Sequence, residues 1–454
     1  MKTERHQSTC DAQAVFSRDH VPWPIWYQCL ILILLTGLAG TSIAKESDGA
    51  LVLTEQAAVA MALEDNPSLA AMQLRYEALR DVPSQVGTLP DPMVNLNAMN
   101  FPTDSFDRDQ EGMTQLQLGF SQVFPFPGKL GLMEEVASFN ARAAGYSTDE
   151  MRLQLEKSVK AKWWQIYYLD RAIETLGKNK GLLQQFITVA KTKYETGKGL
   201  QQDILLAQLE LSKFMDQDIQ LLALRRHQAI QLNSLMDRPA SDHINLPDTV
   251  SLHMPEVLSE AQLYVEAETL KPTLKEKETN IEAARARLEL AKKDRYPDFK
   301  LGVTYGERAG DNPPFMGGSR SDLFSVMLGV KIPLYSGRKQ SKAISQRTTE
   351  LARNRYALID EMGLVRAEIS ASVTDYQKSQ HQFDLFGKGI IPQAQQTVHS
   401  MLAAYQVSEV DFLNLVRSQM TLFNYELQYW KALSEAKQAL ARLEAAVGRG
   451  NIYE

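Results

Sequence analysis

The chain has 454 residues, a formal net charge of −6 and 44% hydrophobic side chains. Its length allows a large core or an elongated body, and its acidic balance argues against a nucleic-acid partner. The sequence has no zinc-peptidase, phosphate-loop or nucleophile-elbow motif, so we expect neither an enzyme nor a bound cofactor.

The first 44 residues are predicted to be a secretory signal peptide. The apolar run Leu30–Leu38 precedes Ser42-Ile43-Ala44, whose small residues have the spacing of a cleavage site. The run is short for a membrane span, which favours cleavage over an uncleaved anchor. Cys10 and Cys29 both lie in this segment. The remaining chain is therefore expected to have no disulfide and no thiolate metal site.

The rest of the chain contains one plan twice, which predicts an internal duplication with repeats at 45–240 and 241–454. Each repeat is expected to hold a helix, a β-hairpin, a long helix and a returning helix. The matching pieces include Asn66-Pro67-Ser68-Leu69 with Lys271-Pro272-Thr273-Leu274, and Tyr194 and Gln208 with Tyr405 and Gln419.

In the first repeat, an amphipathic run predicts a helix over 54–82. Alternating apolar and polar side chains predict strands at about 93–99 and 113–123. A proline-free stretch then predicts a long helix over 129–194, with apolar side chains at alternating steps of four and three. A returning helix is expected from 201 to about 236. Together with the first helix, it would match the long helix in length.

The second repeat predicts strands at about 299–306 and 323–332, then a long helix over 339–405 and a returning helix over 411–447. The apolar seam of this long helix shifts by one residue before Ile391, Ala394, Val398 and Met401. Pro392 should kink the helix near the shift.

Four strands are too few to form a membrane barrel alone, because an open sheet would leave unpaired backbone groups in lipid. The strands must therefore be shared among copies of the chain. Two copies would give eight strands and a filled interior, whereas three would give twelve and room for a pore. The predicted fold class is an α+β membrane protein, with a long coiled-coil tunnel and four strands per chain in a shared twelve-strand barrel.

The sequence resembles the TolC-type outer-membrane efflux proteins over nearly all of residues 50–448. The resemblance rests on Ile391-Pro392-Gln393-Ala394, the segment from Tyr405 to Gln419, Leu440-Ala441-Arg442-Leu443 with Val447-Gly448, and Leu232-Asn233-Ser234-Leu235-Met236 before Arg238-Pro239. It implies a homotrimer in the bacterial outer membrane with a helical tunnel in the periplasm. It also implies two partners, a periplasmic adaptor protein and an inner-membrane pump of the resistance-nodulation-division type.

The resemblance also implies functional positions at the two helical turns. Adaptor docking is expected at Gly197, Lys198 and Gly199 in the first repeat and at Ser408, Glu409 and Val410 in the second. A periplasmic gate is expected just beyond these turns, at Asp203, Asp411, Asn414 and Arg417. Asn414 and Arg417 depart from the acidic ring of the family. We therefore expect a salt-bridged closed gate in which Arg417 pairs with Asp411 or Asp203.

The substrate is the least constrained feature. Phe124-Pro125-Phe126-Pro127-Gly128-Lys129 has a form that, within this family, is more usual in members that serve heavy-metal pumps. This favours export of heavy-metal ions. The alternatives are a drug-efflux duct or a protein-secretion duct of the same fold, and a soluble periplasmic coiled-coil adaptor.

Overall fold

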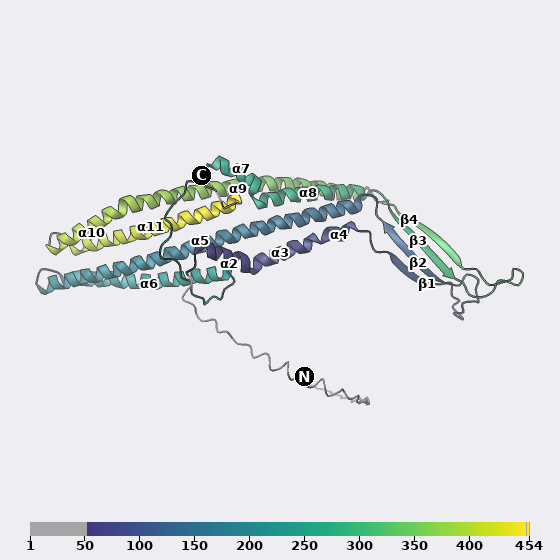
Figure 1. Ribbon diagram of the computed structural model, residues 1–454, viewed down its shortest axis with the longest axis horizontal. Helices are drawn as coiled ribbons and strands as arrows, with labels where there is room; N and C mark the ends of the chain where they lie inside the picture. Colours follow the sequence, from purple (N-terminus) through teal and green to yellow (C-terminus); the bar gives the residue numbers. More distant parts are fainter. Residues whose placement is uncertain (1–51, 451, 454) are drawn as a thin grey trace, which may run out of the picture. The chain divides into compact units, whose positions relative to one another are not determined.

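The computed structural model describes residues 52–450, 452 and 453, so the expected signal peptide at 1–44 lies outside the described residues. The described chain forms long helices and one four-stranded antiparallel sheet (Figure 1). This confirms the expected fold class. Within the described residues, none of the helices is long and apolar enough to cross a membrane.

The first half of the chain contains α2 (Glu55–Asp65), α3 (Pro67–Arg80), α4 (Val82–Gly87), β1 (Met93–Met99), β2 (Gln115–Phe124), α5 (Lys129–Glu195) and α6 (Gln201–Leu235). The second half contains α7 (Glu260–Leu270), α8 (Pro272–Lys293), β3 (Asp298–Glu307), β4 (Leu323–Lys331), α9 (Gln340–Leu385), the π-helix η1 (Phe386–Ile390), α10 (Ile391–Gln406) and α11 (Phe412–Val447).

The helix expected over 54–82 is divided into α2 and α3, and α4 continues past its expected end. Asn66 takes an extended conformation between the first two, and its Oδ1 accepts hydrogen bonds from the backbone N–H groups of Ser68 (3.0 Å) and Leu69 (3.1 Å). Pro67 then occupies the first turn of α3, where its missing N–H costs nothing. An asparagine cap and a helix-starting proline thus break a run that its apolar periodicity alone would continue.

Helix α5 is the scaffold of the described chain. Its 67 residues span about 100 Å, and α2, α3, α4 and α6 all pack along it (Figure 1). Helices α8 and α11 of the second repeat pack against it as well. Its apolar seam is buried at Leu155, Val159, Ile166, Leu169, Leu176, Leu183 and Ala190.

The corresponding rod of the second repeat is interrupted. Helices α9 and α10 are joined by the π-helix Phe386–Ile390, just before Pro392. Proline cannot donate a backbone hydrogen bond, and a π-turn inserts one residue into the helical repeat. The inserted residue accounts for the one-residue shift of the apolar seam, because it rotates every later position around the helix axis. Val398 and Tyr405 are buried on the shifted seam.

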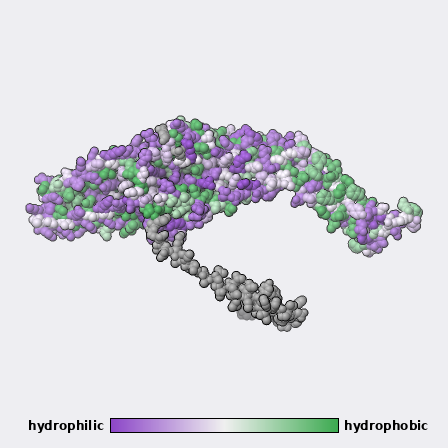
Figure 2. Space-filling view, viewed as in Figure 1, coloured by the Kyte–Doolittle hydropathy of each residue, from purple (hydrophilic) through white to green (hydrophobic). Residues whose placement is uncertain are grey.

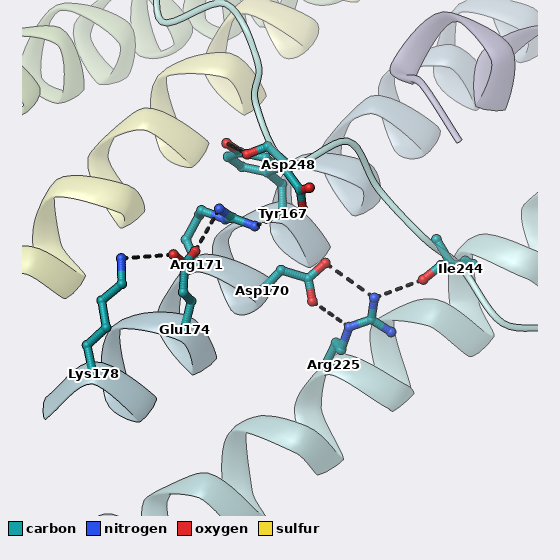
Figure 3. A network of polar contacts seen from close by, with 8 residues as sticks. All are labelled: Tyr167, Asp170, Arg171, Glu174, Lys178, Arg225, Ile244 and Asp248. Atoms are coloured by element: carbon teal, nitrogen blue, oxygen red, sulfur yellow. Dashed lines mark hydrogen bonds and ion pairs between the residues drawn. The ribbon is translucent and has the colours of Figure 1, made fainter. Parts of the chain in front are cut away.

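A polar network fixes the connection between the two repeats to the helices (Figure 3). Arg225 on α6 makes a two-pronged ion pair with Asp170 on α5, with Nε–Oδ1 at 2.5 Å and Nη2–Oδ2 at 3.2 Å. The same guanidinium donates to the carbonyl of Ile244 at 2.8 Å. Nearby, Arg171 pairs with Glu174 at 2.7 Å and approaches Asp248 at 3.9 Å. The connecting segment is therefore held against α5 and α6.

Candidate functional site

The two helical turns that join α5 to α6 and α10 to α11 lie at the same end of the described chain (Figure 1). Both have the same backbone motif. Lys198 N–H donates to the carbonyl of Lys193 at 2.8 Å, and Glu409 N–H donates to that of Ala404 at 2.9 Å. These bonds, with a left-handed residue before each donor, close the helix ends as Schellman motifs. The duplication therefore extends to the geometry of the turns.

The left-handed position is Gly197 in the first turn (φ +72°) and Ser408 in the second (φ +69°). A side chain at this φ is strained, so the second turn has a cost that glycine avoids in the first. Gly199 is required for a different reason. A Cβ there would lie 2.8 Å from the Lys193 Cβ and 3.0 Å from the Tyr194 backbone nitrogen.

A compact set of contacts ties the two hairpins together within one chain. The Lys193 ammonium, on α5, donates to the backbone carbonyl of Tyr405 and to the Ser408 hydroxyl, the latter at 2.9 Å. It also lies 4.3 Å from the centre of the Tyr405 ring, a cation–π distance. We call Lys193, Asp203, Tyr405 and Ser408 the tip clasp.

The buried centre of the tip clasp is a hydrogen bond between α10 and α6. Tyr405 donates its hydroxyl to Asp203 Oδ2 at 3.1 Å, and the two side chains are 3% and 8% exposed. Phe412 on α11 packs against the Tyr405 ring with centroids 5.2 Å apart. Burial, together with the Asp203 carboxylate, raises the pKa of Tyr405 well above its usual value. The tyrosine is therefore a neutral donor and the carboxylate its acceptor.

The other residues expected at the gate lie on the surface of the single chain. Asp411 is the N-cap of α11, and Asn414 and Arg417 follow on its exposed side. Among the ion pairs of the described residues, none involves Arg417. The structure thus pairs Asp203 with Tyr405 inside the chain, and Arg417 has no ion pair with Asp203 or Asp411 among the described residues.

Sequence reasoning had not assigned a role to Lys193 or Tyr405. The signal available was the repeat itself, since Tyr405 recurs in the first repeat as Tyr194. The two positions have different environments, because Tyr194 is 48% exposed and Tyr405 is buried. A periodic pattern cannot distinguish them, and their difference appears only in the packed structure.

The sheet forms the second candidate surface. Its strands are ordered β1-β2-β3-β4. The register aligns Leu96 with Leu118, Leu118 with Tyr305, and Tyr305 with Phe324, so apolar side chains of all four strands share one face. Figure 2 shows apolar colour gathered over these strands, while polar and apolar colours are mixed over the helices.

Most side chains on the opposite face of the sheet are polar or small, and the exceptions are Met93, Met99, Val123, Leu323 and Met327. That face carries Asn95, Asn97, Gln117, Gly119, Ser121, Gly302, Thr304 and Gly306. Within the described chain, β1 and β4 each have one edge without a neighbouring strand. A sheet with one apolar face, one mostly polar face and two open edges is suited to closing a barrel with other copies. No group of three or more residues suited to holding a metal occurs among the described residues.

The chain was then compared with known proteins. The family model for the outer membrane efflux protein matches residues 58–237 and 263–449. The chain belongs to the outer membrane efflux protein family. No curated protein sequence matches it.

Solved structures of outer-membrane proteins share the fold of this efflux protein. VceC from Vibrio cholerae is 18% identical with a TM-score of 0.72, covering 87% of this chain and 96% of VceC. The CmeC channel of Campylobacter jejuni is 11% identical with a TM-score of 0.72, covering 91% of each chain. The open state of the Neisseria gonorrhoeae MtrE channel is 15% identical with a TM-score of 0.69, covering 87% of this chain and 89% of MtrE.

The efflux protein is accordingly an outer-membrane channel with its helical part in the periplasm, and its strands contribute to a shared barrel. Channels of this family are passive, and family members are trimeric outer-membrane components of tripartite pumps. This family membership argues against the alternative prediction of a soluble periplasmic adaptor.

Proposed function

We propose that three copies of this chain form the exit duct of a tripartite efflux pump, with twelve strands in the barrel and a helical tunnel below it. The observation that carries the proposal is the four-stranded sheet, whose apolar face and two open edges demand neighbouring strands. Helix α6 adds a second surface for a neighbouring copy, because Leu205, Leu209, Met215, Ile219 and Leu222 are all at least 49% exposed.

The orientation of the sheet can be tested by placing a charge on each face. Leu96→Arg puts a cation on the apolar face, where Leu96 is 81% exposed. Arginine at the middle of a membrane strand costs about 2–4 kcal/mol. Asn97→Arg is the matched control on the polar face. Heat-modifiable trimers in outer-membrane fractions should be lost or greatly reduced for Leu96→Arg alone. Equal yields from both variants would contradict the proposed barrel.

We further propose that the two turns receive the adaptor and that the tip clasp belongs to the gate. The turns are exposed at Gly197, Lys198, Ser408 and Glu409 and lie side by side, which supports docking of a partner on both at once. The inner-membrane pump, expected to be of the resistance-nodulation-division type, would supply the energy. Crosslinking from a photoreactive residue at Lys198 or Glu409 tests the docking, and capture of no periplasmic adaptor in vivo would count against it.

Heavy-metal ions remain the substrate that we propose, and they would be cargo only. The support is the form of the junction from Phe124 to Lys129. Deletion of the gene, followed by growth on copper, silver, zinc, cobalt, dyes and detergents, tests this proposal. Sensitivity to the metals alone would support it. Sensitivity to dyes and detergents alone would favour a drug-efflux duct, and loss of a secreted protein would favour a secretion duct.

A further inference from the structure

The segment that joins β4 to α9, which we call the junction loop (residues 331–339), exposes apolar side chains. Ile332, Leu334 and Tyr335 are 64%, 80% and 79% exposed. In the equivalent junction of the first repeat, the Phe126 ring stacks on Tyr296 with centroids 4.5 Å apart. The first junction covers its apolar side chain within the chain, whereas the second leaves its own uncovered.

The two junctions also differ in the burial and ion pairing of their basic side chains. Lys129 of the first junction is 5% exposed and pairs with Asp294 at 3.1 Å and Asp298 at 2.9 Å. Among the ion pairs and side-chain hydrogen bonds of the described residues, none involves the three cations of the junction loop, which are Lys331, Arg338 and Lys339. Lys129 pairs with the nearby carboxylates, and Lys331 adds only a longer-range attraction to Asp298. Arg338 and Lys339 have no acidic partner among the residues that the structure describes.

The position of the junction loop places it at the boundary of the membrane. Strand β4 has nine residues, about the length of one crossing, and ends at Lys331. Ile332 continues the alternation that puts Phe324, Val326, Leu328 and Val330 on the apolar face. Beside the loop, an open cleft of about 410 Å³ is lined by Tyr296, Lys331, Leu334, Tyr335 and Lys339. The carboxylates of Asp294 and Asp298 line it as well, but both are paired with Lys129.

We propose that the junction loop binds an anionic phospholipid of the periplasmic leaflet, with the headgroup phosphate at Arg338 and Lys339 and an acyl chain against Ile332 and Leu334. The apolar contact is continuous with the lipid-facing face of β4. The unpaired cations supply the charge that distinguishes an anionic from a zwitterionic headgroup. Tyr335 belongs at the same level, where the aromatic side chains of membrane proteins concentrate. Three such sites per trimer would fasten the barrel to one leaflet.

A tryptophan reporter tests the proposal on the intact trimer. Tyr335→Trp introduces a fluorophore at the junction loop, while the other tryptophans of the described residues, Trp163, Trp164 and Trp430, lie in the helical bundle. The trimer is reconstituted in phosphatidylcholine bilayers that contain increasing fractions of brominated phosphatidylglycerol or brominated phosphatidylcholine. The relative affinity of the two lipids follows from the quenching of the introduced tryptophan.

The expected preference for phosphatidylglycerol is about fivefold per basic side chain at the site. Adding Arg338→Gln and Lys339→Gln should reduce the preference to near one, and raising the salt concentration should weaken it. Arg353→Gln with Arg355→Gln is the control, because it removes two exposed cations from α9 at about 20 Å along the helix. The control pair should keep the preference.

Three results would overturn the proposal. The first is equal quenching by the two brominated lipids. The second is a preference for phosphatidylglycerol that persists in the Arg338→Gln, Lys339→Gln variant. The third is that neither lipid quenches the introduced tryptophan. In the last case, quenching by acrylamide indicates that water covers the loop, and protection from acrylamide indicates a neighbouring copy. Because the inference rests on the barrel lying in the membrane, trimer stability and conductance are measured on each variant. A conducting trimer without lipid preference rejects the site and leaves the channel intact.

Discussion

Tyr405→Phe is expected to destabilise the closed state of the proposed gate. The substitution removes only the hydroxyl that donates to Asp203 at 3.1 Å. Both side chains are buried, so water does not replace the lost donor. A hydrogen bond to a charged group contributes about 1.5–3 kcal/mol. The equilibrium between closed and open tips should therefore shift by about ten- to hundredfold per protomer, and by more if the three protomers open together.

Single-channel conductance in planar bilayers measures this effect as a larger open fraction or a larger conductance. Tyr194→Phe is the matched control, because Tyr194 occupies the same position of the first repeat and is 48% exposed. It should conduct as the wild type does. Asp203→Asn retains an acceptor oxygen but loses the charge, so its effect should be smaller than that of Tyr405→Phe. Wild-type behaviour of Tyr405→Phe, or equal effects of the two tyrosine variants, would refute the role given to the tip clasp.

Three further outcomes follow from the described contacts. Lys271→Met leaves Glu150 without its ammonium partner at 2.8 Å, which should lower the free energy of unfolding by about 3 kcal/mol. In the wild type, burial opposes ionisation of Glu150, but Lys271 outweighs burial and holds the carboxyl pKa below its usual value. That stabilisation is present above the unfolded-state pKa and is lost as the pH falls through the folded-state pKa. In Lys271→Met the effect of burial is opposed only by the side-chain hydrogen bonds from Gln154 and Thr273. The deficit against wild type, measured by denaturant unfolding, should therefore shrink from about pH 7 to about pH 4; a constant deficit would contradict this. Arg417→Ala should alter the conductance in planar bilayers, and an unchanged trace would dismiss the proposed salt-bridged gate. Gly197→Ala should cost about 1 kcal/mol at the turn because of its φ of +72°, although its Cβ would meet no atom within 4 Å. Faster backbone amide exchange at the turn would report that loss, and unchanged exchange would argue against strain there.

The sheet could be predicted from the sequence because the alternation of apolar and polar side chains within each strand indicates which side chains share a face. The alternation of Leu96 with Asn95 and Asn97 fixes a face whatever the partner strand is. The observed register then brings the apolar side chains of all four strands together. The long helix could be predicted as well, because apolar side chains at helical spacing without an intervening proline indicate one continuous helix.

The breaks in the helices were less accessible. The cap at Asn66 interrupts a run whose apolar periodicity continues past it. The π-helix before Pro392 corresponds to a one-residue shift of the apolar seam in the sequence. A proline kink would explain the same shift, so only the backbone structure distinguishes the two. The tip clasp had no local trace. Tyr405 and Asp203 are 202 residues apart, and neither neighbourhood indicates the other.

The π-helix also makes the two repeats mechanically unequal. Helix α5 is continuous from the sheet to its tip, whereas the rod formed by α9 and α10 has a joint at Phe386–Ile390. Around the proposed trimer, three continuous α5 helices would therefore alternate with three helices that are interrupted at η1. In the proposed gate, the expected site of bending is therefore η1, and α5 is expected to keep its position during opening.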